Sequence, residues 1–228
     1  MQNQNHYFVN RKQAGLLLAR NLFEKYRFED TIVLALSQGS ILVGAEIAKA
    51  LHSLIAILMV KDIYLPDGKT IIGSINANGG FVYNNNFSAG ELEEFDSEYR
   101  GFIEESKRQA FHELNVALAQ GGEIDENYFR NRAVIVVSDG ALNGTAFDMA
   151  YEYLKKIAIK KLIMVTPIAS VKAIDRMHIL ADELICLSPV ETTLEINHFY
   201  NDNKLPSTKE TIEILNNIIL NWNQNNIN

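Results

Sequence analysis

The chain has 228 residues, of which 47% are hydrophobic and 21% are charged, and its formal net charge is −7. This length allows a single domain with a large core, and the composition is that of an ordinary globular protein. The negative charge argues against a protein that binds nucleic acid regardless of sequence, because such binding needs a dense field of Lys and Arg. The single cysteine, Cys186, excludes an internal disulfide and a cysteine-rich zinc site.

The N-terminal segment has no apolar signal-peptide core, and no apolar stretch reaches membrane-spanning length. We therefore expect a cytoplasmic protein with no membrane partner and no nucleic-acid partner. The two ends are polar and rich in Asn, which predicts a loose arm over residues 1–9 and a loose tail over residues 223–228.

Apolar periodicity predicts helices and buried strands in alternation along the first quarter of the chain. The expected elements are a helix (11–26), a strand (31–36), a helix (41–51) and a second strand (55–60). A strand–helix–strand unit of this kind favours a parallel sheet with a right-handed crossover.

Turn signals interrupt this pattern after Lys61. Pro66-Asp67-Gly68 and Asn78-Gly79-Gly80 predict an antiparallel β excursion. A long helical pattern follows over residues 88–120, closed by Gly121-Gly122. Its apolar stripe consists of Leu92, Phe95, Tyr99, Phe102, Ile103, Phe111, Leu114 and Leu118. We expect residues 71–122 to form a flexible hood or a dimer arm carrying an inserted helix.

The second half of the chain returns to alternating strands and helices. The expected elements are strands at 133–137, 161–166 and 184–187 and helices from about 145, over 171–178 and from a capping box at 207–210. Five buried strands flanked by helices predict one doubly wound α/β domain spanning residues 1–228. Ligands of such sheets bind beyond the carboxyl ends of the strands, which indicates residues 37–40 and 138–145.

Residues 133–150, AVIVVSDGALNGTAFDMA, contain the clearest candidate site. An apolar strand ends at Ser138-Asp139, and a turn bounded by Gly140 and Gly144 leads into a helix near Thr145. Backbone N–H groups at such a helix start form an anion site, which suits a phosphate with a hydroxyl-bearing group beside it. The alternative is a plain β–α turn in which Asp139 caps the helix. Asp148, one turn further on, is expected at the surface.

This stretch resembles the phosphoribosyl-pyrophosphate-binding motif of the type I phosphoribosyltransferase family. In that motif a strand is followed by two adjacent acids, a Gly, two variable residues and a Thr-Gly-x-Thr loop. Asp139 matches the second acid, and Gly140 and Gly144 match the glycines. Ser138 stands in place of the first acid, and Asn143 and Thr145-Ala146 also depart from the pattern. Further segments are similar to the family in the same order over residues 10–215: NRKQAGLLLA, LSQGSILVGAEIA, VKDIYLPDGKTIIGSI, TPIAS, LADELICL and HFYND.

The resemblance implies a homodimer that binds phosphoribosyl pyrophosphate, or a related ribose phosphate, and transfers the phosphoribosyl group to a nucleobase-like acceptor. It implies Mg²⁺ on the pyrophosphate, with no direct protein ligand to the metal. Asp139 and Ser138 would be the catalytic residues, facing the ribose hydroxyls. The phosphate would be bound by Gly140, Ala141, Leu142, Asn143, Gly144 and Thr145. The pyrophosphate would be bound by Ser37, Gln38, Gly39 and Ser40, with Lys61 as a cation.

The departures from the motif leave the activity open. A hydrogen bond to a charged group contributes about 1.5–3 kcal/mol, so replacing the first acid by Ser138 would slow transfer roughly ten- to a hundred-fold. The alternatives to an atypical transferase are a catalytically impaired binding or regulatory module that kept the fold, and a scaffold with a vestigial site. For Lys61 the alternative is a lysine at a strand end that faces water.

Overall fold

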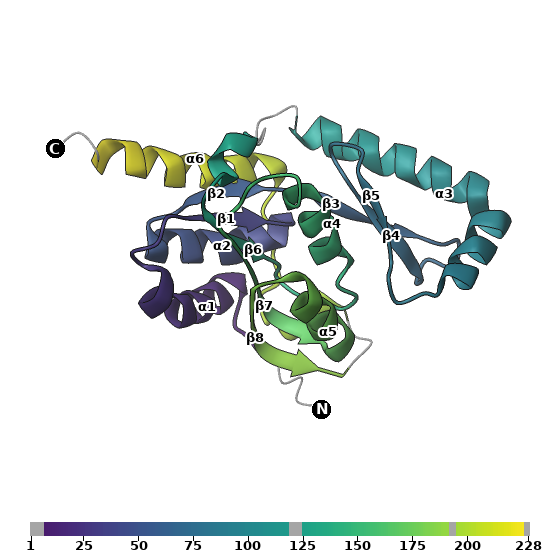
Figure 1. Ribbon diagram of the computed structural model, residues 1–228, viewed down its shortest axis with the longest axis horizontal. Coiled ribbons are helices and arrows are strands. Elements are labelled where there is room, and N and C mark those ends of the chain that lie inside the picture. The colour runs from purple at the N-terminus through teal and green to yellow at the C-terminus, as the bar shows by residue number, and fades with distance from the viewer. Residues whose placement is uncertain (1–6, 119–124, 192–194, 226–228) are drawn as a thin grey trace.

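The computed structural model describes residues 7–118, 125–191 and 195–225, and its central feature is a five-stranded parallel sheet (Figure 1). The strand order is β2–β1–β6–β7–β8. The strands are β1 (Thr31–Ala35), β2 (Leu54–Ile57), β6 (Ala133–Val137), β7 (Lys161–Ser170) and β8 (Glu183–Val190). From β1 the chain proceeds outward to β2, whereas from β6 it proceeds in the opposite direction to β7 and β8. The direction in which successive strands are added therefore reverses between β1 and β6. This reversal is the switch point of the sheet, and doubly wound sheets bind their ligands beside it.

Helices cover both faces of this sheet, which explains why its strands are continuous apolar runs. One face carries α1 (Arg11–Tyr26), α2 (Gln38–Leu51) and α6 (Thr208–Asn225), and the other carries α4 (Thr145–Leu154), α5 (Val171–Leu180) and η1 (Glu126–Phe129). Because side chains alternate along a strand, Val33 and Ile135 enter the first core, and Ile32 and Val134 enter the second. The expected doubly wound fold class is confirmed.

A second, antiparallel sheet projects from one side of the central domain (Figure 1). It consists of β3 (Val60–Tyr64), β4 (Ile71–Asn76) and β5 (Phe81–Tyr83), and the long helix α3 (Ala89–Leu118) covers one of its faces. Ile63, Ile72, Ile103 and Leu114 form the small core between them. We call residues 60–118 the hood. The expected β excursion and inserted helix are thus present.

The boundary between the two sheets differs from the sequence prediction. The apolar run at 55–60 was expected to be one strand, but β2 ends at Ile57 and Val60 opens β3 in the other sheet. Between them Leu58 N–H still donates to the Ala35 carbonyl (2.8 Å), and Val60 N–H donates to that of Leu36 (3.3 Å). One continuous apolar run therefore serves two sheets, which composition alone does not reveal.

Two expectations about α3 and the chain ends also need adjustment. On α3, Ile103 and Leu114 are buried, but Phe102 and Phe111 are 46% and 41% exposed and leave the apolar stripe. Phe8 is buried and its backbone pairs with the 199–201 segment, so the described end of the expected N-terminal arm is held in place. Helix α6 continues to Asn225. The remainder of the arm (1–6), Gly121-Gly122 and the last three residues (226–228) lie outside the described residues.

The length and apolar character of the helices bear on whether one of them could cross a membrane. Within residues 7–118, 125–191 and 195–225, none combines the length and the apolar character that a crossing requires.

Candidate functional site

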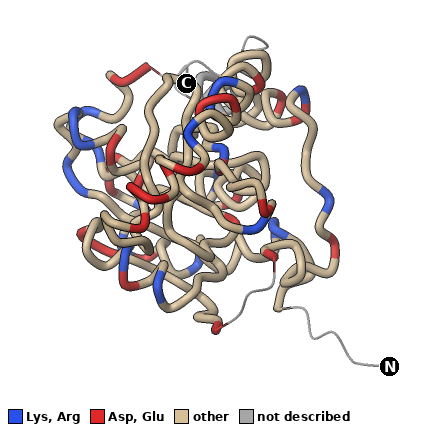
Figure 2. The backbone as a smooth tube through the Cα atoms, turned by 90° about the vertical axis from the view of Figure 1, so that its right-hand side faces the viewer, with Lys and Arg blue, Asp and Glu red and all other residues tan. Residues whose placement is uncertain are grey.

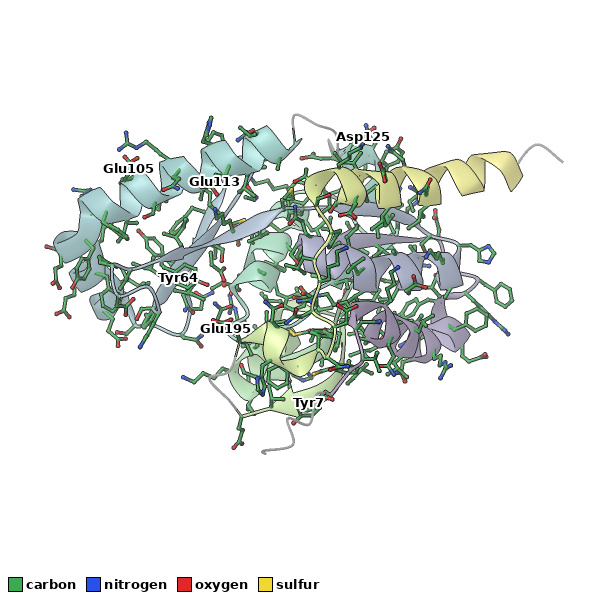
Figure 3. The ribbon with its side chains drawn as sticks, turned by 180° about the vertical axis from the view of Figure 1, so that it is seen from behind. Tyr7, Tyr64, Glu105, Glu113, Asp125 and Glu195 are labelled. Atoms are coloured by element: carbon green, nitrogen blue, oxygen red, sulfur yellow. The ribbon has the colours of Figure 1, made fainter. Side chains whose placement is uncertain are left out.

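A cavity of about 360 Å³ lies at the switch point, beyond the carboxyl ends of β1 and β6. The central domain contributes Ser37 and the 138–144 segment to its wall, and the hood contributes Val60, Asp62, Tyr64 and Ile71. Glu195 and Ile196, at the start of η2 (Ile196–Phe199), also line it. Figure 3 shows that Tyr64 and Glu195 come from two different parts of the chain. The cavity is therefore shared between the sheet domain and the hood.

The loop over residues 140–145 is anchored to the end of β7. Ala141 donates its N–H to the Ile168 carbonyl (2.9 Å), and its carbonyl accepts from Ser170 N–H (2.9 Å). Gly144 has φ +80°, a left-handed conformation that favours glycine, and it directly precedes α4. These contacts fix the loop so that its residues 140–144 face the cavity.

Three backbone N–H groups of this loop are available to a ligand. The N–H groups of Leu142, Asn143 and Gly144 have no acceptor in the part of the chain that the structure describes. Asn143 accepts instead through its side chain, with Oδ1 receiving Thr145 N–H (3.2 Å) and Thr145 Oγ1 (2.9 Å). Unpaired N–H groups at a helix N-terminus are the usual elements of an anion site.

Ser138 and Asp139 are both buried, and both are already engaged by the protein. Ser138 Oγ donates to the Gly140 carbonyl (2.7 Å), so this hydroxyl shapes the turn. The Asp139 carboxylate accepts from Arg11 Nε (2.6 Å) through one oxygen. Its other oxygen accepts from Ser37 Oγ (3.0 Å) and Ser40 Oγ (3.2 Å).

Arg11 was not identified from the sequence, yet it organises the centre of the site. It is 2% exposed, and its guanidinium also donates to Asn197 Oδ1 (2.7 Å) and lies 4.5 Å from the centre of the Tyr200 ring. Tyr200 in turn donates its hydroxyl to the Asp139 carbonyl (2.5 Å), and burial raises the pKa of that hydroxyl. A signal was present, since Arg11 shares the helical spacing of Leu18 and the other buried residues of α1.

The 37–40 segment forms the first turn of α2 and not an open loop. Ser37 is its N-cap, and Ser37 Oγ accepts from Ser40 N–H (3.0 Å). Gln38 turns toward α6 and donates to Thr208 Oγ1 (3.2 Å), while Gly39 lies against the Asp139 carboxylate. Ser37 is the member of this segment that lines the cavity.

Lys61 lies away from the cavity. Its ammonium forms an ion pair with Glu113 of α3, on the opposite face of β3. Because side chains alternate along a strand, Lys61 and Ile63 face α3, whereas Val60, Asp62 and Tyr64 face the cavity. Sequence reasoning missed Asp62, although its alternation with Ile63 could have indicated it.

Asp62 is a partly buried carboxyl at the junction of the hood and the loop. Ser74 Oγ donates to it (2.6 Å), and the side chain of Thr145, the first residue of α4, is its other hydrogen-bonding neighbour. Burial raises the pKa of Asp62, and these two hydroxyls act in the opposite direction. Burial also raises the pKa of Tyr64, helped by the charges of Asp62 and Glu195.

The charge of the cavity differs from that of the chain as a whole. Figure 2 shows basic and acidic residues interspersed along the backbone, but the described lining contains Asp62, Asp139 and Glu195 and no Lys, Arg or His. Within the described ranges there is no group of three or more side chains able to hold a metal ion by themselves. Asp148, expected at the surface, is buried and paired with Arg176 (2.5 Å).

Comparisons with known proteins place this fold in context. No protein-family model matches the chain. Two curated proteins of Mycobacterium tuberculosis, from strains CDC 1551 / Oshkosh and H37Rv and each named "Putative phosphoribosyl transferase", are 24% identical to it over 212 residues. These matches cover 91% of this chain and 46% of each relative, so the chain spans about half the length of the curated relatives it matches.

A solved structure resembles the whole chain. The crystal structure of TT1426 from Thermus thermophilus has a TM-score of 0.67 and 21% sequence identity, and the match covers 94% of this chain and 98% of that one. It therefore shares the fold. The expected resemblance of this chain to phosphoribosyltransferases is confirmed in sequence by the two curated relatives, along most of its length.

Proposed function

We propose that this chain is a phosphoribosyltransferase domain that binds phosphoribosyl pyrophosphate, or a related ribose phosphate, and transfers the phosphoribosyl group to a nucleobase-like acceptor. The observation that carries the proposal is the 140–144 loop, which lines a cavity at the N-terminus of α4 and in which the N–H groups of Leu142, Asn143 and Gly144 have no acceptor among the described residues. The similarity to proteins named as phosphoribosyl transferases supports the same assignment. Because the match covers only 46% of the length of each relative, the activity in their names is carried over to this chain only as part of this proposal.

Different residues of the site would bind the phosphate and stabilise the charge that develops during transfer. Leu142, Asn143 and Gly144 would bind the 5-phosphate through their N–H groups, since Gly140 and Ala141 already donate to Ser138 Oγ and the Ile168 carbonyl. Asp139 would act as a fixed negative charge near the anomeric carbon, where positive charge develops during transfer. Its ion pair with Arg11 holds it in place but offsets part of its charge.

Mg²⁺ suits a cavity of this composition. A pyrophosphate brings several negative charges to a lining that already holds three carboxyl groups and no described cationic side chain. Mg²⁺ takes oxygen ligands and is commonly held by one or two carboxylates together with substrate phosphates. Asp62 and Glu195 offer such oxygens, and the bound ion would neutralise charge on the departing pyrophosphate.

Three further expectations belong to the same proposal. Tyr64 and Ile71 of the hood wall would face the acceptor ring. A homodimer is supported by three exposed apolar side chains of α3, Phe102, Phe111 and Val116, and sedimentation analysis would measure it. A cytoplasmic location rests on the sequence, and fractionation of cells would test it.

Calorimetric titration with phosphoribosyl pyrophosphate, with and without Mg²⁺, tests the binding step. Asn143→Asp is the informative variant, because its side chain can still accept from Thr145 N–H and Oγ1 while placing a negative charge in the loop. We expect it to weaken binding by at least about tenfold through like-charge repulsion. Asn21→Asp, an equal charge change on the exposed face of α1, is the control and should leave the affinity unchanged.

Release of pyrophosphate in the presence of common nucleobases tests the transfer step. A transferase binds the ligand and releases pyrophosphate when a base is added. Binding without release would identify a module that kept the pocket and lost the reaction. A protein that does not bind the ligand at all, with or without Mg²⁺, would refute the proposal.

A further inference from the structure

We propose that the acceptor in this site is an uncharged base carrying an amino group, and that Glu195 selects it by accepting a hydrogen bond from that group. A base with an oxygen in place of the amino group, or with a carboxylate, fits the same position less well. The inference rests on the proposed function, because it takes the cavity to hold a phosphoribosyl group and its acceptor.

The segment that carries Glu195 is held against the loop that follows β6. Ile196 packs directly over Gly140, since a Cβ on this glycine would lie 2.8 Å from Ile196 Cγ2. Asn197 Oδ1 accepts from the Arg11 guanidinium (2.7 Å). Glu195 therefore enters the cavity lining from a segment that is fixed beside the loop.

These contacts place Glu195 at the acceptor end of the cavity. In the proposed function the anomeric carbon lies beside Asp139, the residue before Gly140, and the acceptor nitrogen has to reach that carbon. The phosphate end lies at Thr145, the first residue of α4, and Asp62 faces that hydroxyl. Because Mg²⁺ can be held by one carboxylate together with substrate phosphates, Asp62 can serve the ion while Glu195 faces the acceptor.

Glu195 is the carboxylate of the described lining that is free to bind an acceptor. Asp139 and Asp62 already accept hydrogen bonds from the protein. Glu195 is exposed, caps no N–H group of η2 and forms no ion pair within the described ranges. It lies close enough to Tyr64 for its charge to help raise the pKa of that hydroxyl, so the two groups face the same space (Figure 3).

A carboxylate at this position distinguishes bases by the groups on their edges. It accepts a hydrogen bond from an amino group, as Glu and Asp do from the amino group of cytosine. A carbonyl oxygen on the ring would instead turn its lone pairs toward the carboxylate, and a carboxylate on the base would add a second negative charge. The described lining contains no Lys, Arg or His to compensate either one.

The same hydrogen bond favours the transfer step. A ring nitrogen of the acceptor donates its electron pair to the anomeric carbon, the bond between this carbon and the pyrophosphate oxygen breaks, and pyrophosphate leaves with the electron pair of that bond. Positive charge passes to the base during this attack, and the Glu195 carboxylate stabilises it. A proton carried by the attacking nitrogen is then released to water.

Release of pyrophosphate, measured at saturating phosphoribosyl pyrophosphate and Mg²⁺, compares bases in matched pairs. Adenine and hypoxanthine differ by an amino group against an oxygen, as do cytosine and uracil, so both ring sizes are covered. In each pair that reacts, kcat/KM should be about ten- to a hundredfold higher for the amino base, the range expected for one hydrogen bond to a charged group. Orotate, a uracil that carries a carboxylate, should react more slowly than uracil.

Glu195→Gln removes the charge at nearly constant size and should remove most of this preference, because a carboxamide can also donate to an oxygen. Glu105→Gln, on the exposed outer part of α3 (Figure 3), makes the same charge change and should keep it. The affinity for phosphoribosyl pyrophosphate with Mg²⁺ should be the same in Glu195→Gln as in the unchanged protein. This measurement separates recognition of the acceptor from a role of Glu195 as a metal ligand.

Calorimetric titration of the protein saturated with ribose 5-phosphate gives the same comparison without turnover. The amino base of a pair should bind more tightly than its oxygen counterpart, and Glu195→Gln should reduce that difference.

The outcomes separate the class of acceptor from the transfer reaction. Tighter binding of the amino bases without release of pyrophosphate would support the acceptor class and overturn the transfer. Equal or reversed preference within the pairs, or a preference that persists in Glu195→Gln, would overturn the inference and leave the transfer standing. Failure of every base to bind and to react would overturn it too. A loss of Mg²⁺-dependent affinity for phosphoribosyl pyrophosphate in Glu195→Gln would assign the carboxylate to the metal, and so would also overturn the inference.

Discussion

The buried ion pair between Arg11 and Asp139 should be the part of the site most sensitive to substitution. The two side chains are 2% and 10% exposed, and Arg11 Nε lies 2.6 Å from the carboxylate. Arg11→Met keeps an unbranched apolar stem but removes the guanidinium. The carboxylate would then remain buried with the hydroxyls of Ser37 and Ser40 as its described side-chain donors.

The loss of folding stability caused by Arg11→Met follows from the burial of the carboxylate that it leaves behind. Removing one partner of a buried ion pair costs about 3–5 kcal/mol, because the other charge stays buried without compensation. Arg11 also loses its bond to Asn197 (2.7 Å) and its contact with the Tyr200 ring, which places the loss in the upper part of that range. In a domain of about 150–250 residues each kcal/mol lowers Tm by about 2–4 °C, so a loss of about 4–5 kcal/mol predicts a fall of roughly 8–20 °C.

Urea unfolding followed by circular dichroism measures this loss, with Arg132→Met as the matched control. Arg132 pairs with Asp30 at 2.8 Å, but the Asp30 side chain is 69% exposed, and such pairs contribute about 0–1 kcal/mol. Combining Arg11→Met with Asp139→Asn should cost less than the two single changes added together, since each single change leaves the same partner behind. A loss no larger than that of Arg132→Met, or strictly additive changes, would refute the reasoning.

Two further predictions concern stability. A Cβ at Gly39 would overlap the Asp139 carboxylate and lie 2.8 Å from Arg11 Nε, so Gly39→Ala should destabilise the protein. A Cβ at Gly101 of α3 would meet nothing within 4 Å. Gly101→Ala should therefore stabilise the protein by up to about 1 kcal/mol in the same urea assay. Glu183 should support stability in acid: burial opposes its ionisation, but hydrogen bonds from two lysines and a tyrosine lower its pKa to about 2 from an ordinary 4.5. The contribution of Glu183 to folding stability is therefore complete above about pH 4.5 and is lost as pH falls toward 2. Glu183→Gln should flatten that part of a plot of Tm against pH. An unchanged plot would show that these hydrogen bonds are absent in solution.

The main architecture could be predicted because its signals are local. Runs such as residues 31–36 and 133–137 are too short and too continuous to be anything but strands covered on both faces, and the structure has β1 and β6 there. The same reasoning failed at 55–60, where an apolar run passes from the central sheet into the hood. Apolar content reports that a segment is buried, but it does not report in which of two adjoining cores.

The site was only partly predictable, because its defining contacts join distant parts of the chain. The loop at 140–145 was visible in the sequence since strand, glycine and helix start are neighbours. The partners of Asp139 were not, as Arg11 lies 128 residues away, and the two meet only after α1 has packed on the sheet. Lys61 and Asp62 are adjacent residues of one strand, so their side chains face opposite sides of the sheet. Which of the two lines the cavity depends on which face of β3 packs against α3, and the sequence does not show this.

The engagement of Asp139 bears on which function the site can perform. A carboxylate that stabilises developing positive charge is most effective when it is fixed in place and its charge is not offset. Here the network of Arg11, Ser37 and Ser40 provides the fixation, but the guanidinium 2.6 Å away offsets the charge. Asp139→Asn should therefore cost more in folding stability than in affinity for a ribose phosphate. In a working transferase it should in addition lower the rate of pyrophosphate release, and a variant that keeps both its stability and its rate would show that Asp139 is neither the anchor of the site nor a participant in its chemistry.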